Sequence, residues 1–450
     1  MEKQASPTTN TPPWVRTNFE QFERELNGSA GSTFHELRRK AFDRFVALGL
    51  PTTKHEDWKY TNVQSLAKTT FVPSAPGATV ELSAVESLSQ MLPEAVRVVF
   101  VDGRLSASLS SLEGLAAGAQ VGSLAAVLAG AEGSEALRQM VEAHLGRIAP
   151  FDEESFVALN TAFVHDGAVI RIERGANVEV PILLLFLTSA SEKVVSHPRV
   201  LIVAEAASSA TVVECYAGGT NAYFTSGVSE VFVEQDAVLD HYKLNLEGPS
   251  AYHVSTIQVE QEAKSTFATN AFSFGGALVR NEVNPTLKGE GISTVMNGLS
   301  VLAGEQHVDN HTIIDHAKPN CESKEWYKGI YADRSHGVFN GTIIVRQDAQ
   351  KTNAIQSNQS LLLSKDADVD TKPQLKIWAD DVRCTHGATI GQLDEDALFY
   401  LRSRGIGKDA AYDVLIEAFA ADIINEVKPE ALRGFLNTLL LEKLRSTRKS

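Results

Sequence analysis

A long stretch of alternating polar and apolar residues limits most strongly what this chain can fold into. From about Phe163 to about residue 390 the pattern has a period of two, as in "RVLIVAEA", "ATVVECYAG", "YHVSTIQVEQ" and "GTIIVRQDA". Such alternation, rich in β-branched and aromatic residues, is typical of strands, and no convincing helix interrupts it. The sequence therefore predicts one large β region.

A weak internal repeat runs through this β region. A small residue opens a new alternating run at intervals of 34, 27, 28 and 26 residues, namely at Ala176, Ala210, Ala237, Ser265 and Gly291. Repeats of this length made only of strands and turns are typical of a β-solenoid, in which each coil buries its inward face against its neighbours. A sandwich or a double-sheet jelly roll also has regularly spaced hairpins, and the residues alone leave both alternatives open.

Helical patterns flank the β region on both sides. Apolar residues recur at helical spacing in residues 14–50, which predicts two helices, and again in residues 121–148, whereas residues 76–120 give no clear pattern. After the β region, Asp394 is a good N-cap for a helix that ends before Gly405. Two further helices are predicted from "KDAAYDVLIEAFAADIINEV" and "PEALRGFLNTLLLEKLRS".

The chain is thus expected to have four segments. These are a disordered leader (1–13), an N-terminal helical and mixed region (14–160), a β core (161–392) and a C-terminal helical region (393–450). The leader does not have the basic and apolar parts of a signal peptide.

The overall charge and the cysteines exclude several classes of protein. The formal net charge is -15, which argues against nucleic acid or an anionic membrane as the main partner, because both attract clustered Lys and Arg. Cys215, Cys321 and Cys384 are widely spread, so neither a disulfide framework nor a zinc ribbon is expected. The longest apolar run, "VPILLLFL", is far shorter than the roughly 20 residues of a membrane-spanning helix. We expect a soluble protein of the reducing cytoplasm.

Motifs of ordinary enzymes are absent from the sequence. "GIGKDA" at 405–410 is not a phosphate-binding loop, because Asp409 stands where Ser or Thr would hold magnesium, and "GEGIST" at 289–294 has no third glycine. An alternative is a carbohydrate-active enzyme on a β-helix, which needs two carboxylates flanking a groove. The acids of the β region, such as Glu214, Asp240 and Glu260, are expected instead on outward, solvated strand positions.

Three histidines lie close together in "HVDNHTIIDH". On a strand, His307 and His311 share one face while His316 points to the other, so one run cannot aim all three at one metal ion. We expect structural, hydrogen-bonded histidines, with Asp309 and Asn310 in a tight turn between them.

Cys384 and His386 form a more specific pair. The preceding "QLKIWADDVRCTHG" alternates as a strand, so residues two apart project from the same face. Two ligands are too few for a tetrahedral metal or iron-sulfur site, which needs four, and a second subunit is the natural source of the others. The residues leave open a plainer reading, in which Cys384 packs as a small hydrophobic residue beside a hydrogen-bonded His386.

The stretch "DDVRCTHGATIGQLDEDALFYLRSRGI" at 380–406 closely resembles the end of the core domain of the SufB/SufD family of iron-sulfur cluster assembly proteins. The resemblance covers about residues 150–430, and "LPTTKHEDWKYTNVQSL" at 50–66 together with Cys-x-His-Gly-Ala-Thr-x-Gly favours the SufD-type branch.

The resemblance implies a mainly β fold: a right-handed parallel β-helix between N- and C-terminal helical regions. It implies a scaffold without enzymatic activity, which pairs with a SufB-like subunit through the β-helices and binds a SufC-like ATPase through C-terminal helices within 394–446. His386, and more weakly Cys384, would serve as ligands of a transient iron-sulfur cluster shared with the SufB-like subunit, and this chain would bind no nucleotide. The cluster type, flavin binding, a homodimer of the isolated chain and a purely structural role stay open.

One apolar stripe has two interpretations. Residues in "ALRGFLNTLLL" can dock the ATPase or can pack inside this chain, and we expect the second for at least half of them, which are Leu432, Phe435, Leu436, Leu439 and Leu440.

Overall fold

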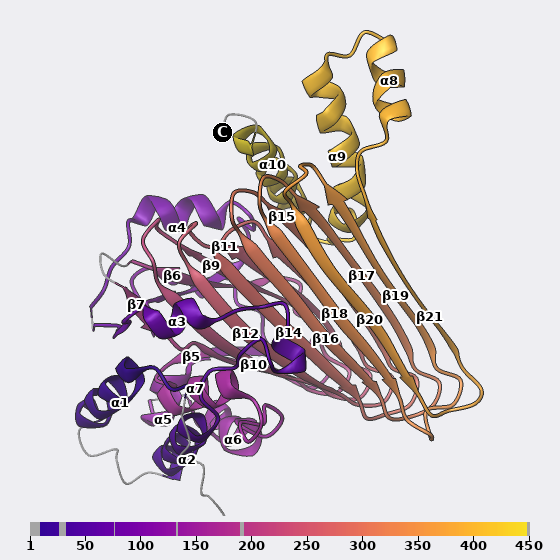
Figure 1. Ribbon diagram of the computed structural model, residues 1–450. Helices are drawn as coiled ribbons and strands as arrows, with labels where there is room; N and C mark the ends of the chain where they lie inside the picture. The colour runs from indigo at the N-terminus through magenta and orange to yellow at the C-terminus, as the bar shows by residue number, and fades with distance from the viewer. Residues whose placement is uncertain (1–9, 27–32, 76, 132–133, 190–192, 448–450) are drawn as a thin grey trace, which may run out of the picture.

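The computed structural model describes residues 10–26, 33–75, 77–131, 134–189 and 193–447. The described part is a β-solenoid of two parallel sheets with helices at both ends of the chain (Figure 1). The strands of the solenoid alternate between the sheets along the chain, and each pairs in parallel with the next strand of the same sheet. The prediction of a parallel β-helix is confirmed, and the sandwich and jelly roll are excluded, because their neighbouring strands run antiparallel.

The two sheets are named A and B. Sheet A contains β1 (Val72–Pro73), β4 (Ala119–Ser123), β5 (Gly167–Ile172), β7 (Val194–Ser196), β8 (Arg199–Ala204), β10 (Phe224–Val233), β12 (Tyr252–Gln261), β14 (Leu278–Leu287), β16 (His307–His316), β18 (His336–Val345) and β20 (Asp368–Ile377). Sheet B contains β2 (Val96–Val101), β3 (Arg104–Leu105), β6 (Ile182–Thr188), β9 (Ser209–Gly218), β11 (Val238–Leu246), β13 (Thr266–Ser273), β15 (Ser293–Leu302), β17 (Glu322–Tyr331), β19 (Asn353–Leu362) and β21 (Arg383–Gly391).

The helices of the described part precede or follow most of the strands. The N-terminal ones are α1 (Pro13–Glu25), α2 (Thr33–Leu48), a 3-10 turn η2 (Glu56–Trp58), α3 (Gln64–Lys68), α4 (Leu82–Ser89), α5 (Leu124–Leu128), α6 (Glu135–His144) and α7 (Ser155–Phe163). The C-terminal ones are α8 (Glu395–Ser403), α9 (Lys408–Ile424) and α10 (Glu430–Thr447). The predicted helices at both ends are therefore confirmed, and Asp394 caps α8 by accepting hydrogen bonds from the amides of Asp396 and Ala397.

The weak repeat of the sequence marks one corner of the solenoid. Asp236, Lys264 and Gly291 each have a positive φ in the turn that leads into a strand of sheet B. Ala237 and Ser265 come directly after two of these turn residues, so the small residues recur because the same tight corner recurs. The coils are not of one length: Tyr252 pairs with Leu278, whereas His336 pairs with Asp368, five residues or so further along in the coil.

The inner space between the sheets holds the largest apolar cluster. Inward side chains of both sheets meet there, among them Val212, Ile257, Phe267, Met296 and Phe339. The outer face of sheet A is covered near the N-terminus by α1, α3 and α7, whereas that of sheet B is covered by α9 and α10. The solenoid is thus sealed on one side of each sheet by its own helices.

The apolar stripe of α10 belongs to this intramolecular packing. Leu432, Leu436 and Leu440 are at most 1% exposed and lie in the same cluster as Leu244 and Leu299 of sheet B. Phe435 and Leu439 are partly buried against that cluster. The interpretation of the stripe as core is confirmed.

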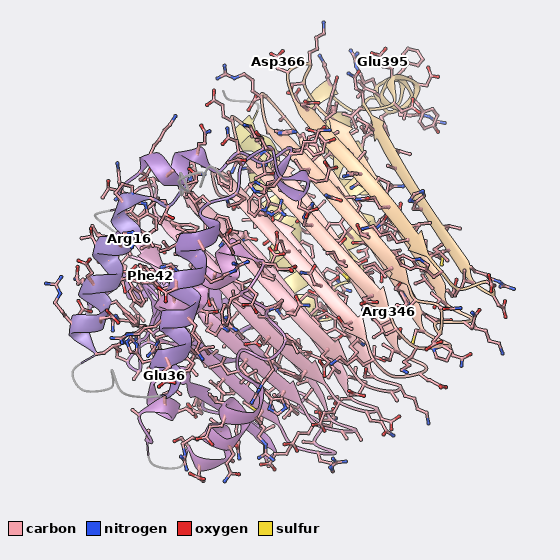
Figure 2. All side chains as sticks on the ribbon, turned by 60° about the horizontal axis from the view of Figure 1, so that its bottom comes forward. Arg16, Glu36, Phe42, Arg346, Asp366 and Glu395 are labelled. Carbon is pink, nitrogen blue, oxygen red and sulfur yellow. The ribbon has the colours of Figure 1, made fainter. Side chains whose placement is uncertain are left out.

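The two ends of the solenoid differ. At one end β2, in the part of the sequence that gave no clear pattern, pairs in parallel with β6 and extends sheet B. The N-terminal helices, which carry Arg16 and Phe42, gather at that end, while Glu395 lies at the other (Figure 2). There β20 and β21 are the outermost strands, and no described strand pairs with their free edges. The solenoid is therefore closed at its beginning and open at its end.

Two further expectations concern the chain as a whole. Most of the predicted leader, residues 1–9, lies outside the described residues, and α1 begins at Pro13. Of the helices in the described ranges, none combines the length and the apolar character required to cross a membrane.

Candidate functional site

Cys384 and His386 lie on β21, the last strand of sheet B. Their register partners on β19 are Ala354 and Gln356, which are 0% and 1% exposed. Register partners in a parallel ladder project to the same face, so both side chains point toward the inner space of the solenoid. The predicted strand and the shared face are present, and the position is the open end of the inner space.

The two side chains differ in burial. Cys384 is half-buried and packs against a cluster that includes Ile343, Val345 and Ala354. Burial raises the pKa of its thiol, and a hydrogen bond with the backbone of Ala354 offsets part of the increase. His386 is exposed. The pair therefore offers an imidazole that is open to solvent and a thiol that is protonated at neutral pH.

A row of polar side chains continues from His386 into the solenoid. Glu325 of β17 pairs in register with Gln356, which pairs with His386. The Gln356 side-chain amide donates a hydrogen bond to Glu325 Oε2 over 2.6 Å, and both residues are almost fully buried. Burial raises the pKa of Glu325 to about 7. Gln356 Oε1 has no hydrogen-bond partner among the described residues, so the row keeps one free acceptor beside the His386 position.

The other two cysteines do not join the pair. Cys215 is fully buried in β9, as expected, and burial strongly raises the pKa of its thiol. Cys321 follows the turn residue Asn320, whose φ is 61°, and is buried in the inner apolar cluster. Within the described ranges, the one group of three His, Cys, Asp or Glu side chains close enough to share a metal ion is elsewhere and contains neither Cys384 nor His386.

The three neighbouring histidines are distributed as the alternation predicts. His307 and His311 lie on the outer face of β16, and His316 is buried on the inner face, where its Nε2 is 2.9 Å from Ser323 Oγ. The predicted turn at Asp309 and Asn310 is wrong, because both residues lie in the middle of the strand. Parallel neighbours on both sides keep this polar run extended, which a single sequence does not reveal.

Asp309 is in fact part of a buried charged cluster beneath the N-terminal segment. Arg280 donates hydrogen bonds to Asp309, to Glu282 (Nη2–Oε1, 2.6 Å) and to the backbone carbonyl of Asp57 (2.9 Å). Its guanidinium also stacks over Trp58, 3.8 Å from the ring centroid. Burial opposes ionisation of Asp309, but Arg280 outweighs it and keeps the pKa of Asp309 below its ordinary value.

A polar cleft of about 210 Å³ lies beside this cluster. Its lining includes Arg280, Glu282 and Glu154, and burial together with the neighbouring Glu282 raises the pKa of Glu154 to about 7. The charges of Arg280 and Glu282 are already paired with each other. We therefore interpret the cluster as the attachment of the N-terminal segment to sheet A.

The acids expected on the outside of the solenoid are only partly there. Asp240 pairs with Lys428 and Glu260 with Lys288 on the surface. Glu214 is instead fully buried and points inward, where it accepts hydrogen bonds from Tyr216 (2.7 Å) and Ser229 (2.9 Å). The expectation of a solvated Glu214 is wrong, because buried hydrogen bonds replace its contact with water.

Apolar side chains are exposed on the C-terminal helices as well. The pair of helices α8 and α9 projects from the body of the solenoid (Figure 1). Phe399 and Tyr400 of α8 are 73% and 57% exposed, and Val414 of α9 is 44% exposed. Of these helices α8 has no buried residue.

Comparison with known families decides what kind of protein has this solenoid. The profile described as "SUF system FeS cluster assembly, SufBD core domain" matches residues 186–419, and the one described as "SufBD protein N-terminal region" matches residues 15–184. The chain belongs to the SufBD family. The resemblance of the sequence to SufB and SufD is thereby confirmed, and so is its assignment to iron-sulfur cluster assembly.

Individual members of the family are similar over most of their length. The "Iron-sulfur cluster assembly protein SufD" of Escherichia coli (strain K12) is 34% identical over 394 residues, which are 87% of this chain and 88% of the relative. An "Iron-sulfur cluster assembly SufBD family protein" of Synechocystis is 33% identical over 423 residues, 91% of each chain. "Protein ABCI7, chloroplastic" of Arabidopsis thaliana is 29% identical and covers 94% of this chain and 89% of its own length.

The structure also brings together residues that the sequence did not group. His307, His336 and Asp368 stand in one row across β16, β18 and β20. They are 29 and 32 residues apart, within the range of the weak repeat. A repeat anchored on the turn residues would have aligned them, whereas short motifs cannot.

Proposed function

We propose that this chain is a non-enzymatic scaffold subunit that pairs with a SufB-like subunit and supports formation of a nascent iron-sulfur cluster between them. The observation that carries the proposal is the position of Cys384 and His386: two ligands, on one face of the last strand, at the open end of the solenoid. A cluster needs about four protein ligands, so two of them call for a second chain.

The open end suits such a partner. A free strand edge presents a row of backbone N–H and C=O groups that a strand of another chain can pair with. Apolar side chains surround this end, with Ile377, Trp378 and Ile390 between 39% and 60% exposed. A SufB-like solenoid that continues both sheets would bury them and bring its own ligands to the inner face. The same edges allow a homodimer when the isolated chain has no other partner.

The two side chains have complementary chemistry for this task. A thiolate and an imidazole are both ligands of iron in clusters, and the cluster is cargo that the assembly builds and passes on. The raised pKa of Cys384 means that its proton must leave when iron binds. His386 is neutral and accessible without this step once its pyridine-type nitrogen is free, which supports the larger role for His386.

Replacement of His386 by alanine tests the ligand role. In a complex reconstituted with the SufB-like and SufC-like subunits, we expect cluster assembly, measured as bound iron and acid-labile sulfide, to fall by about tenfold or more, because even residues that only orient a ligand have effects of that size. Cys384→Ser is expected to have a smaller effect.

The control is Thr385→Ala, which changes the residue between them, on the opposite face of the same strand. It should leave assembly unchanged. If His386→Ala assembles clusters at the normal rate in an intact complex, the chain has a purely structural role beside its partner.

We also propose that α8 and α9 bind the SufC-like ATPase. The exposed Phe399 and Tyr400 support this, because α10 and most of the apolar residues of α9 are used inside the chain. Phe399→Ser is expected to weaken ATPase binding, measured by calorimetry, by about tenfold or more, since burial of a phenylalanine contributes about 1.5–3 kcal/mol. The thermal midpoint should not change, because Phe399 is 73% exposed.

Leu112→Ser is the matched control, because Leu112 is 44% exposed and precedes the solenoid in sequence. Equal affinity of the wild type and Phe399→Ser would place the ATPase elsewhere. The absence of a phosphate-binding motif from the sequence supports a chain that binds no nucleotide itself. Three free cysteines support a reducing compartment such as the cytoplasm.

A further inference from the structure

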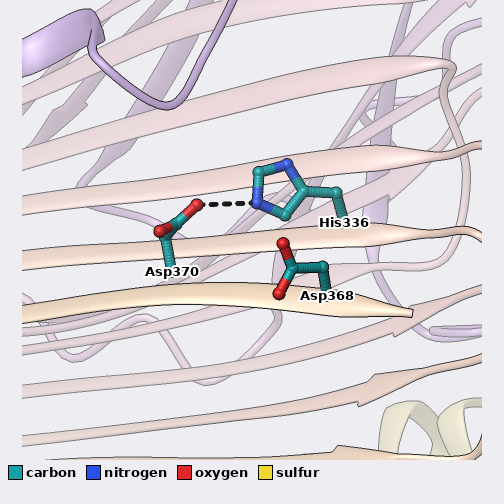
Figure 3. A group of neighbouring side chains, drawn as sticks. All are labelled: His336, Asp368 and Asp370. Atoms are coloured by element: carbon teal, nitrogen blue, oxygen red, sulfur yellow. Dashed lines mark hydrogen bonds and ion pairs between the residues drawn. The ribbon is translucent and has the colours of Figure 1, made fainter. Parts of the chain in front are cut away.

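A second group of possible ligands lies on the outer face of sheet A. His336 of β18 and Asp368 and Asp370 of β20 have one ligand atom each, and these three atoms are all within 4.8 Å of one another. In Figure 3 both carboxylates point toward the imidazole, and His336 Nε2 is 3.0 Å from Asp370 Oδ2. The group is open to water, because the side chains of His336 and Asp370 are 28% and 35% exposed.

The register of the solenoid creates this group. His336 pairs with Asp368, and residues two apart on β20 share a face, so Asp370 lies diagonally across from the same histidine. Two like charges side by side on one strand repel each other, so the pair of aspartates costs free energy without a cation nearby. His336 is the cation-accepting or metal-binding side chain closest to both.

A chain of hydrogen bonds continues from His336 in the other direction. Its Nδ1 is 3.1 Å from Nδ1 of His307, whose Nε2 is 2.9 Å from Thr61 Oγ1. Thr61 in turn donates its hydroxyl proton to Asp309 Oδ2 over 2.5 Å. Because Thr61 has one proton and gives it to Asp309, the proton between Thr61 and His307 must belong to His307.

Counting protons along this chain reveals a missing positive charge. Bonds at His307 Nε2, between the two Nδ1 atoms and at His336 Nε2 need three ring protons, whereas two neutral imidazoles carry two. A metal ion on His336 Nε2 removes the need for the third proton. His336 Nδ1–H then donates to His307, and His307 Nε2–H donates to Thr61, so that both rings are neutral and every bond is made. A hydrogen bond from the second ring nitrogen is the usual support of a metal-bound histidine.

We propose that His336, Asp368 and Asp370 bind one divalent transition-metal ion, with water in the remaining positions. One imidazole and two carboxylates suit Mn²⁺, Fe²⁺ or Zn²⁺, and their charge balances that of the ion. Small rotations of the carboxylates bring the ligand atoms from within 4.8 Å to the roughly 3–4 Å that bonds of about 2.1 Å require. The site is independent of the proposed function, because Cys384 and His386 lie on the other sheet and face inward.

The test uses the full chain freed of metal by a chelator and titrated with Mn²⁺ alone, followed by the electron paramagnetic resonance signal of free Mn²⁺. We expect one ion per chain in the wild type, and an affinity about tenfold or more lower in Asp370→Asn and Asp368→Asn. Asp366→Asn is the control, since Asp366 is exposed in the turn before β20 (Figure 2) and makes the same change in charge.

Two further variants separate a built site from loose attraction to surface charge. His336→Gln should abolish the nitrogen modulation of an imidazole in pulsed spectra of bound Mn²⁺, and His307→Gln should weaken binding by about 10- to 100-fold. Equal binding in the wild type and both aspartate variants overturns the proposal, as does an equal loss in Asp366→Asn. Since no partner subunit takes part, the result does not depend on the outcome for His386→Ala.

Discussion

Arg280→Met is expected to lower the free energy of unfolding by about 3–5 kcal/mol, the usual range for removal of one partner from a buried ion pair. Arg280 is 0% exposed and serves two carboxylates, and it also holds the backbone of Asp57 in the N-terminal segment. Methionine fills much of the volume but leaves Asp309 and Glu282 without their counter-charge. The decrease should appear as a lower midpoint in urea, and residues 56–61 should lose protection from proteolysis.

Two controls identify the cause. Arg346→Met removes a bidentate pair with Asp315, but Arg346 is 60% exposed (Figure 2), so a loss of no more than about 1 kcal/mol is expected. Adding Asp309→Asn and Glu282→Gln to Arg280→Met should recover part of the stability, because it removes the unpaired charges. An equal effect at Arg280 and Arg346 would mean that the cluster does not hold the N-terminal segment.

Glu325→Gln is expected to stabilise the chain at pH 8 but not at pH 5. The pKa of Glu325 is about 7 in the folded chain and near 4.5 when unfolded. The folded state therefore holds a proton that the unfolded state has lost between these pH values, and stability falls as pH rises from about 4.5 to about 7. The difference corresponds to about 3 kcal/mol once the carboxyl is ionised at pH 8, and the glutamine variant does not suffer this loss.

The measurement is the difference in unfolding free energy between variant and wild type at the two pH values. Glu322→Gln, on the same strand but exposed, is the control and should give the same difference at both. A constant difference for Glu325→Gln would mean that Glu325 is ionised throughout or never. The result also bears on His386, because Gln356 connects the two positions in one buried row.

The sequence predicted the elements well and the side-chain clusters poorly, for a physical reason. The alternation around Cys384 and the cap at Asp394 depend on residues within a few positions of each other, so a single sequence contains them. The role of Arg280 depends on Asp309, 29 residues away, and on Asp57 from another part of the chain. Which face of a strand is covered, and by what, depends on the register between coils, and coil length varies.

The same reason explains the errors at Glu214 and Asp309. Acidic side chains are mostly exposed, so an outward Glu214 and a turn at Asp309 were the expectations that composition favours. In the solenoid each acid meets a donor from the next strand: His241 lies beside Glu214 and Arg280 beside Asp309. Buried charge is tolerated where a neighbouring coil supplies the opposite group.

The open end of the solenoid has a consequence for the order in which the chain folds and unfolds. Each coil is held by the coil before it and the coil after it, so cohesion in such a fold is a sum over neighbours. The last coil, with β20 and β21, has a neighbour on one side only. It is therefore the coil that frays first and forms last. Cys384, His386, Asp368 and Asp370 all lie on it, so a subunit that docks there acts as the missing next coil and fastens the candidate ligands in place as it binds.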